Sequence, residues 1–308
     1  MFLKLFLLIF GLILLVVSSN KFVTAASSLA NSFKIPKMVI ALTIASFCTC
    51  TPELAISFNS IISNDYDITL ANVIGSCVVN ILLIVGLASL VGPIKIKTAT
   101  VSKELPLLFI TTTIFSILFL DNTLSRLDAL LLIFIFGIFC VYLYNMIKRF
   151  QQLEDDKPRY NRKISLIITF ISIMIITLAS EVVVDSALYI SEKLNISAKL
   201  ISMVLIVIGT SLPELMITVV SAKKGEFDMT VGNIVGTNIF NICIVLGLPT
   251  LIFGNVYSLS FNYVDLGVVV LSALLFYILS KSEREISRYE GILMLFVFGL
   301  YYTYLFLI

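Results

Sequence analysis

The chain has 308 residues and a formal net charge of +2; 59% of its residues are hydrophobic and 13% are charged. Such a chain has too little polar surface to cover a soluble globule, so an all-α polytopic membrane protein is predicted. It has no histidine, which excludes Ser-His-Asp triads, HExxH zinc sites and histidine pH switches, so an enzyme is the least favoured class.

Apolar windows of about 20 residues, bounded by charges or by Gly, Pro and Asn, predict ten membrane-spanning helices. The run from Phe2 to Val17 is interpreted as the start of the first helix and not as a signal peptide, because no small-residue cleavage site precedes a soluble domain. The predicted spans are 2–28, 37–62, 68–92, 104–120, 127–147, 164–190, 198–222, 229–253, 262–280 and 288–307.

The distribution of basic residues predicts the orientation of the chain. Of the 21 Lys and Arg residues, four fall on the side of the N-terminus and seventeen on the other side, which includes the polar segment 148–163. The positive-inside rule then places both termini outside the cell and this linker in the cytoplasm. An integral protein of the cell (inner) membrane is predicted, with the lipid bilayer as its surroundings and with neither a nucleic acid nor a protein partner.

An internal repeat with an offset of 161 residues relates the two halves. The segment Ala71–Ile81 aligns without gaps on Gly232–Ile242, and a Thr-x-x-Pro-Glu pattern occurs at Thr49–Glu53 and again at Thr210–Glu214. Because five spans, an odd number, separate the copies, they have opposite orientations in the membrane, as in transporters built from inverted repeats. The predicted organisation is a first five-helix repeat at 1–147, a linker at 148–163 and a second five-helix repeat at 164–308.

A carboxylate and a proline interrupt the apolar stretch 198–220. Proline has no N–H and its ring clashes with the carbonyl four residues back, here Gly209, so the helix is predicted to break before Glu214 and to free backbone oxygens. A carboxylate at mid-membrane depth is costly and is found mostly along an ion or substrate path. Structural pairing is the alternative, but neither Pro-Glu motif contains a Lys or Arg.

Polar side chains at matched spacings accompany the two glutamates. Asn80 follows Glu53 by 27 residues, and Asn241 follows Glu214 by the same number. Residues four apart share one face of a regular helix, so hydroxyls and carboxylates of both halves can line one cavity. The asparagines could instead form hydrogen bonds between helices. The side chains so placed are Thr49, Glu53, Ser76, Asn80, Thr210, Glu214, Thr237 and Asn241.

The charge of this cavity indicates its ligand. Two ionised glutamates held close together require about two positive charges, from one divalent or two monovalent cations. Calcium accepts six to eight oxygen ligands in flexible geometry, whereas magnesium gives up its water reluctantly, so calcium is favoured. The scarcity of soft ligands argues against zinc or copper, although Cys48, Cys50 and Cys77 lie near the motifs.

The sequences GTSLPE (209–214) with GNIVGTNIFNI, and CTCTPE (48–53) with ANVIGSCVVN, resemble the two alpha-repeats of the sodium/calcium exchangers of the cation/calcium antiporter superfamily. The resemblance places the alpha-1 motif at 45–87 and the alpha-2 motif at 206–248. It implies a secondary antiporter that exchanges Na⁺ for Ca²⁺ by alternating access, with broken helices at the midplane and no cofactor besides the transported ions.

The resemblance also implies a role for each motif residue. Glu53 and Glu214 would bind both ions, and Thr49 and Thr210 would contribute to the calcium position. The sodium positions would be lined by Ser76, Asn80, Ser211, Thr237 and Asn241, with backbone oxygens of Ser46 and Val207.

Two departures from the family pattern bear on which ions couple. Cys50 stands where the pattern has serine, and a neutral thiol is a poor sodium ligand, so the stoichiometry stays open. Asn241 stands where potassium-dependent relatives have aspartate, which indicates no need for potassium.

Two other functions remain open: an H⁺/Ca²⁺ antiporter and, less favoured, a cation channel. Extra hydroxyls and amides favour sodium over protons, and an inverted repeat with broken helices favours alternating access over a channel. Glu181 and Asp185, four residues apart near the outer end of the sixth span, are expected to be solvated or to line a vestibule.

Overall fold

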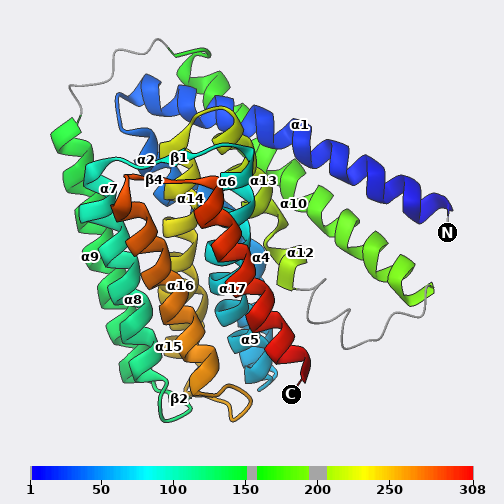
Figure 1. Cartoon of the computed structure of the whole chain (residues 1–308), viewed down its shortest axis with the longest axis vertical. Coiled ribbons are helices and arrows are strands. Elements are labelled where there is room, and N and C mark those ends of the chain that lie inside the picture. The colour runs from blue at the N-terminus through cyan, green and yellow to red at the C-terminus, as the bar shows by residue number, and fades with distance from the viewer. Residues whose placement is uncertain (1, 151–157, 194–206, 308) are drawn as a thin grey trace.

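The computed structural model describes residues 2–150, 158–193 and 207–307. The chain is mostly helical, with long helices packed side by side and four short strands, in connections between helices, that form two pairs (Figure 1). Two predicted segments lie partly outside the described residues: the middle of the linker 148–163 and the first part of the span 198–222.

The first half begins with the long helix α1 and ends with α9. Its second span is a broken helix, and its third span continues through a π-helical segment. The elements are α1 (Phe2–Phe33), α2 (Lys37–Ile40), η1 (Ala41–Ala45), α3 (Ser46–Thr49), α4 (Thr51–Ile62), α5 (Tyr66–Val78), η2 (Val79–Val85), α6 (Gly86–Val91), β1 (Ile94–Lys95), α7 (Thr98–Ser102), α8 (Glu104–Leu118), β2 (Thr123–Leu124) and α9 (Arg126–Phe150).

The second half has a similar order of elements where it is described, except that no helix corresponds to α7. Its elements are α10 (Arg162–Lys193), α12 (Val207–Thr210), α13 (Leu212–Lys223), α14 (Phe227–Phe240), η4 (Asn241–Leu246), α15 (Gly247–Phe253), β3 (Val256–Tyr257), α16 (Tyr263–Ser282), β4 (Glu285–Ile286) and α17 (Arg288–Leu307).

Within the described residues, eight helices are long and apolar enough to cross a membrane, and a ninth candidate is the pair Lys37–Thr49 and Thr51–Ile62, bent by 46°. They correspond to nine of the ten predicted spans. The remaining one, 198–222, is represented by α12 and α13 only, so the number ten stays a prediction. The first helix continues past its predicted end at residue 28, because Ser27 and Ser28 are buried and do not meet water there.

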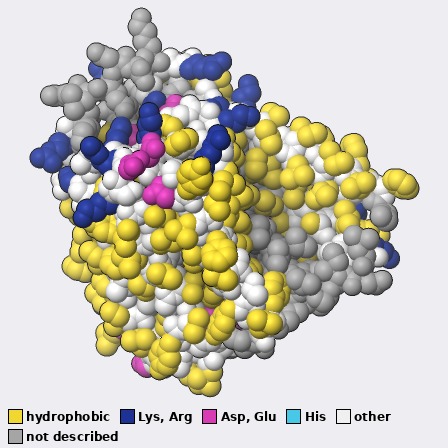
Figure 2. All heavy atoms as spheres, in the orientation of Figure 1, with side chains coloured by type: hydrophobic (Ala, Val, Ile, Leu, Met, Phe, Trp, Pro, Cys, Tyr) yellow, Lys and Arg dark blue, Asp and Glu magenta, His cyan; other side chains and the backbone are white. Residues whose placement is uncertain are grey.

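The surface of the molecule is divided between apolar sides and a basic end. Large apolar side chains such as Phe2 on α1 and Leu127 and Phe134 on α9 are exposed, as expected of helices that face lipid. In the view of Figure 2, Lys and Arg side chains gather at the end of the molecule that carries β1 and β4. This distribution agrees with the sequence-based expectation of one strongly basic face.

Two short antiparallel strand pairs join the halves, β1 with β4 and β2 with β3. Their register pairs Lys95 with Glu285 and Leu124 with Val256. Adding 161 to 95 gives 256, and adding 161 to 124 gives 285, so the offset of the sequence repeat converts one strand pair into the other. The same offset relates the hydroxyl pairs Ser60–Thr69 and Ser221–Thr230, at 2.5 and 2.9 Å.

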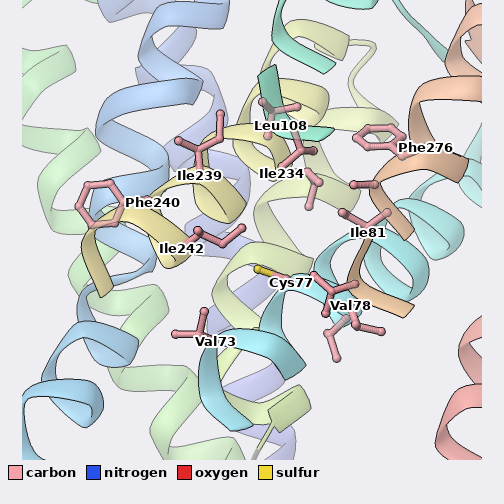
Figure 3. Close-up of a cluster of buried hydrophobic side chains, with 14 of the residues drawn as sticks. Val73, Cys77, Val78, Ile81, Leu108, Ile234, Ile239, Phe240, Ile242 and Phe276 are labelled. Atoms are coloured by element: carbon pink, nitrogen blue, oxygen red, sulfur yellow. The ribbon is translucent and has the colours of Figure 1, made fainter. Parts of the chain in front are cut away.

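The larger hydrophobic core surrounds the third span of each half. Figure 3 shows Val73 and Cys77 of α5 packed with Ile239 and Ile242 of α14 and η4, with α8 and α16 contributing further side chains. A smaller core joins α1 and α10 to α13 through Phe22, among others. Helices α1 and α10 lie side by side and reach away from the rest of the bundle (Figure 1).

Candidate functional site

The second span of the first half and its counterpart in the second half are both broken, at positions related by the offset of 161. Cys50 separates α3 from α4 with φ −79° and ψ 0°, and Ser211 separates α12 from α13 with φ −87° and ψ 8°. Pro52 and Pro213 follow in the first turn of the second segment, where a missing N–H costs no helical hydrogen bond. The predicted break before Glu214 therefore lies at Ser211.

Glu53 and Glu214 lie in the first turns of α4 and α13, and both are buried. Helix N-termini carry partial positive charge, which favours carboxylates at these positions. The two groups are close enough for the charge of Glu214 to act on Glu53. Among the residues that the structure describes, neither forms an ion pair with a Lys or Arg.

The oxygens of these carboxylates are short of hydrogen-bond donors. Within the described part of the chain, both oxygens of Glu214 and Oε2 of Glu53 have no hydrogen-bond partner. The Thr49 hydroxyl lies beside Glu214, but it donates to the Ser46 carbonyl at 3.3 Å. A buried carboxylate without donors or a cationic partner is strongly disfavoured unless a cation supplies the charge.

Irregular helix lies beside the predicted asparagines. Asn80 is in the π-helical segment η2, and Asn241 begins the π-helical segment η4. Both side chains are fully buried, and neither the amide oxygen nor the amide nitrogen has a partner among the described residues. π-helical turns inside α-helices are rare and are frequent at functional sites, because they leave backbone groups out of the regular ladder.

Further buried hydroxyls in the two halves also lack a hydrogen-bond partner among the described residues. Three of them had been selected from the sequence: Ser76, Ser211 and Thr237. Native proteins leave few buried polar groups unpaired. The two glutamates, the two asparagines and these hydroxyls thus share buried oxygen atoms without a partner among the described residues, and oxygen is the ligand atom that hard cations prefer.

The remaining predicted residues differ in what their side chains do. The Ser46 hydroxyl donates to the carbonyls of Ala41 and Asn233, at 2.8 and 3.3 Å, and the Ser46 carbonyl accepts the N–H of Cys50 at 3.0 Å. Thr210 is half-buried, and Val207 is the first residue of α12.

Cys50 lies between the two halves of the site. Its thiol is buried and donates to the carbonyl of Thr237, with sulfur and oxygen 3.7 Å apart. The charges of both Glu214 and Glu53 act on it. The residue that sequence analysis marked as a departure from the family pattern is therefore in contact with the helix that carries Thr237 and Asn241.

The broken helix of each half packs against the asparagine-bearing helix of the other half. Segments α3 and α4 contact α14 and η4, and segments α12 and α13 contact α5 and η2. Gly236 permits this approach: a Cβ there would lie 2.8 Å from the Leu42 Cα and would clash with the Ser46 hydroxyl. Residues from both repeats are thus brought together, as the matched motifs predicted.

A cavity of about 330 Å³ adjoins the helix breaks. Its walls include Pro52, Thr210 and Pro213, and also Glu181 and Asp185 of α10. These two carboxylates are exposed. Their position on the wall of a cavity that reaches Thr210 agrees with the predicted vestibule role.

The structure adds one residue that sequence reasoning missed, Ser57, and it shows a helix-end hydrogen bond for Asn72, whose role the sequence left open between ion binding and such a bond. Ser57, one turn after Glu53, is fully buried, and its hydroxyl has no partner among the described residues. Its spacing of four from Glu53 is a signal that could have identified it. Asn72 donates to the backbone carbonyl of Glu53 at 3.1 Å, so it fixes the start of α4.

Comparison with known proteins gives consistent matches over the whole chain. The family model described as "Sodium/calcium exchanger protein" matches residues 3–145 and 164–307. The inner membrane protein YrbG of Escherichia coli (strain K12) is 34% identical over 300 residues, covering 94% of this chain and 92% of YrbG. The sodium/calcium exchanger MaX1 of Methanosarcina acetivorans is 26% identical, and the match covers 98% of both chains.

A solved structure of the sodium-calcium exchanger NCX_Mj, soaked with Na⁺ and Ca²⁺, has a TM-score of 0.84 to this chain at 29% sequence identity. The match covers 97% of each chain. These similarities agree with the family resemblance of the two alpha-repeat motifs, and they identify an integral membrane antiporter of a transporter family, not of an enzyme family. The chain belongs to the sodium/calcium exchanger family.

Proposed function

We propose that this protein exchanges Na⁺ for Ca²⁺ across the cell membrane by alternating access. The observation that carries the proposal is the pair Glu53 and Glu214, contributed by opposite halves of the chain, buried, and without a cationic side chain among the described residues. Two negative charges in a poorly solvated site require about two positive charges. One Ca²⁺ or two Na⁺ ions supply that number.

The surrounding oxygens favour calcium as the divalent ion. Calcium tolerates irregular coordination by carboxylate, hydroxyl and amide oxygens, whereas magnesium requires near-octahedral geometry and retains water. We assign Glu53, Glu214, Thr49 and Thr210 to the calcium position. The sodium positions are assigned to the glutamates with Ser76, Asn80, Ser211, Thr237 and Asn241, with Cys50 as the weakest ligand and the carbonyls of Ser46 and Val207 as supplementary oxygens.

Alternating access rests on the two-fold repeat of the chain. The strand pairs and the hydroxyl pairs Ser60–Thr69 and Ser221–Thr230 obey the same offset of 161, which supports an inverted repeat. In such transporters, two related halves exchange conformations and open the site first to one side and then to the other. We place the protein in the cell (inner) membrane, as the inner membrane protein YrbG is, with both termini outside.

The test is calcium-45 uptake into proteoliposomes that contain the purified full chain. Outward gradients of sodium, potassium or protons are imposed in turn at equal ionic strength. Uptake driven by sodium alone is expected, because the hydroxyl and amide oxygens suit a hard monovalent ion. Uptake driven by protons and not by sodium would replace the proposal with an H⁺/Ca²⁺ antiporter, and single-channel currents would replace it with a channel.

A further inference from the structure

A second cavity, lined mostly by polar residues, lies beside the C-terminal part of α1. Its volume is about 470 Å³, which is within the usual size of a ligand pocket. Its walls come from four parts of the chain: α1, the start of α2, residues just after α13, and the linker. The residues on its walls are Val23, Thr24, Ser27, Ser28, Asn31, Lys37, Arg159, Lys224 and Glu226.

The charges around this cavity are unbalanced. Three basic side chains face one acidic side chain, and Glu226 already forms an ion pair with Lys37 at 3.1 Å. Lys224 donates to two neutral acceptors on α1, the Asn20 carbonyl and the Thr24 hydroxyl, at 2.5 and 2.7 Å. Arg159 is exposed and lies over the ring of Tyr160.

The surplus positive charge affects the Lys224 side chain on the cavity wall. Burial lowers the pKa of the Lys224 amine, and the nearby charges of Arg159 and Lys21 lower it further, while Glu226 opposes them in part. An anion placed between Lys224 and Arg159 would remove this repulsion. Guanidinium and ammonium groups on either side of a small polar cavity are the usual recognition elements for a phosphate group.

One hydrogen-bond donor and one acceptor without partners among the described residues also lie at the wall. Ser27 is only 7% exposed, and within the described residues its hydroxyl has no hydrogen-bond partner. The Oδ1 atom of Asn31, one turn further along α1, is also buried and unpartnered there. Because Ser27 lines the cavity, its hydroxyl would be free to donate to an anionic oxygen bound there.

We propose that this cavity binds a phosphate group at the cytoplasmic face, held by Arg159, Lys224 and Ser27. The phosphate could belong to an anionic phospholipid or be free in the cytosol. The exposed large apolar side chains of α1 run from Phe2 to Val17 and recur at Phe33, and the α1 residues of the cavity, Val23 to Asn31, lie between them, where lipid head groups are expected. Basic pockets between helices at a cytoplasmic face bind such head groups.

A bound phosphate would link three elements of the chain. While it is bound, these elements could move only together. Ser27 belongs to α1, Lys224 follows α13, and Arg159 precedes α10. Because α13 begins next to Glu214, the ligand would connect the cytoplasmic end of the molecule to the carboxylate-bearing helix. Occupancy is therefore expected to stabilise the protein and to modulate exchange.

The test measures binding to the delipidated full chain by native mass spectrometry. The probes are dioleoylphosphatidylglycerol, dioleoylglycerol with the same acyl chains and no phosphate, and inorganic phosphate. The variants are Arg159→Gln and Ser27→Ala, with Lys163→Gln as the control, because Lys163 is exposed and does not line the cavity.

Removal of the Arg159 charge is expected to weaken phosphatidylglycerol binding about fivefold. Ser27→Ala should weaken it as well, while Lys163→Gln should not. Displacement of the lipid by inorganic phosphate at low concentration would instead identify a soluble phosphate as the ligand. Equal binding of both phosphate probes by the wild type and by both variants, or equal binding of dioleoylglycerol, would overturn the proposal.

Discussion

At the scale of single residues, Glu214 offers the most direct test of the ion site. Replacement by glutamine keeps the volume of the side chain and removes half of the proposed site charge. Calcium-45 transport by Glu214→Gln is expected to fall to background. The ion-free variant should unfold at the same temperature as the wild type or higher, because a buried carboxylate without a partner is destabilising.

Glu283→Gln is the matched control for this substitution, since Glu283 is exposed in the turn before β4. Its flux should equal that of the wild type. A Glu214→Gln protein that is monodisperse in size-exclusion chromatography and yet transports calcium at near-normal rate would remove Glu214 from the site.

Cys50 and Ser211 occupy equivalent positions in the two repeats but differ in chemistry. The thiol of Cys50 is a poorer ligand for sodium than the hydroxyl of Ser211. Cys50→Ser is therefore expected to preserve or increase the sodium dependence of calcium efflux, and Ser211→Cys is expected to reduce it. Sodium titration of calcium-45 efflux measures both, with the exposed Cys140→Ser as control. Loss of sodium coupling in Cys50→Ser would contradict the assigned roles.

At this scale, the sequence identified those site residues that recur at a fixed spacing. Residues four apart or 161 apart identified the glutamates, the asparagines and most of the hydroxyls. Spacing could not show that the Ser46 hydroxyl is already engaged by Asn233, nor that Cys50 contacts Thr237. Both contacts depend on which helix of the other half lies opposite. A single sequence does not show which helices lie side by side.

At the scale of elements, a buried carboxylate begins the fourth helix of each repeat. Glu104 and Asp265 are related by the offset of 161, and each accepts a hydrogen bond from a tyrosine of the following helix. Tyr142 of α9 donates to Glu104, and Tyr301 of α17 donates to Asp265 at 2.9 Å. These bonds tie the fourth helix to the fifth in each half.

The two tyrosines should differ in their contribution to stability. Asp265 also caps α16 by accepting the N–H of Asn262 at 2.9 Å, whereas Glu104 has an oxygen without a partner among the described residues. Tyr142→Phe is thus expected to destabilise the protein by about 1–3 kcal/mol, and Tyr301→Phe by less. Thermal unfolding in detergent measures the difference, with the exposed Tyr289→Phe as control. A larger effect at Tyr301 would contradict this account.

Element positions were largely predictable, because apolar length and bounding charges mark a span. The helix breaks followed from Pro52 and Pro213. The π-helical segments at Asn80 and Asn241 did not, since apolar length and periodicity do not distinguish a π-helical turn from an α-helical one. For the same reason the extension of α1 to Phe33 was missed: Ser28 is bonded to Tyr160, which is distant in sequence.

At the scale of the whole molecule, the basic end seen in Figure 2 predicts the orientation in the membrane. A cysteine introduced at Lys163 should react with an impermeant maleimide only after the cells are permeabilised. One introduced at Asp121, in the turn before β2, should react on intact cells. The wild type serves as the background control for both. The reverse pattern would invert the proposed topology.

The charge of the empty site determines how the molecule can couple two ions. With Glu53 and Glu214 ionised and no cation bound, a change of access would carry about two negative charges through a poorly solvated region, which is costly. The empty protein should therefore remain open to one side. Loaded with one Ca²⁺, or with sodium ions that balance the carboxylates, the site is nearly neutral and can change access. This asymmetry would make the proposed exchange obligatory.

The same argument sets the expected voltage dependence. Each elementary charge that crosses the membrane contributes about 2.3 kcal/mol per 100 mV, so exchange of more than two Na⁺ for each Ca²⁺ should respond to voltage. If Cys50 removes one sodium position, exchange becomes electroneutral, and Cys50→Ser should then restore a voltage response. In proteoliposomes, calcium/calcium exchange is expected to persist without sodium, while net calcium efflux requires sodium on the opposite side. Sustained net calcium flux with no countercation on either side would contradict obligatory exchange.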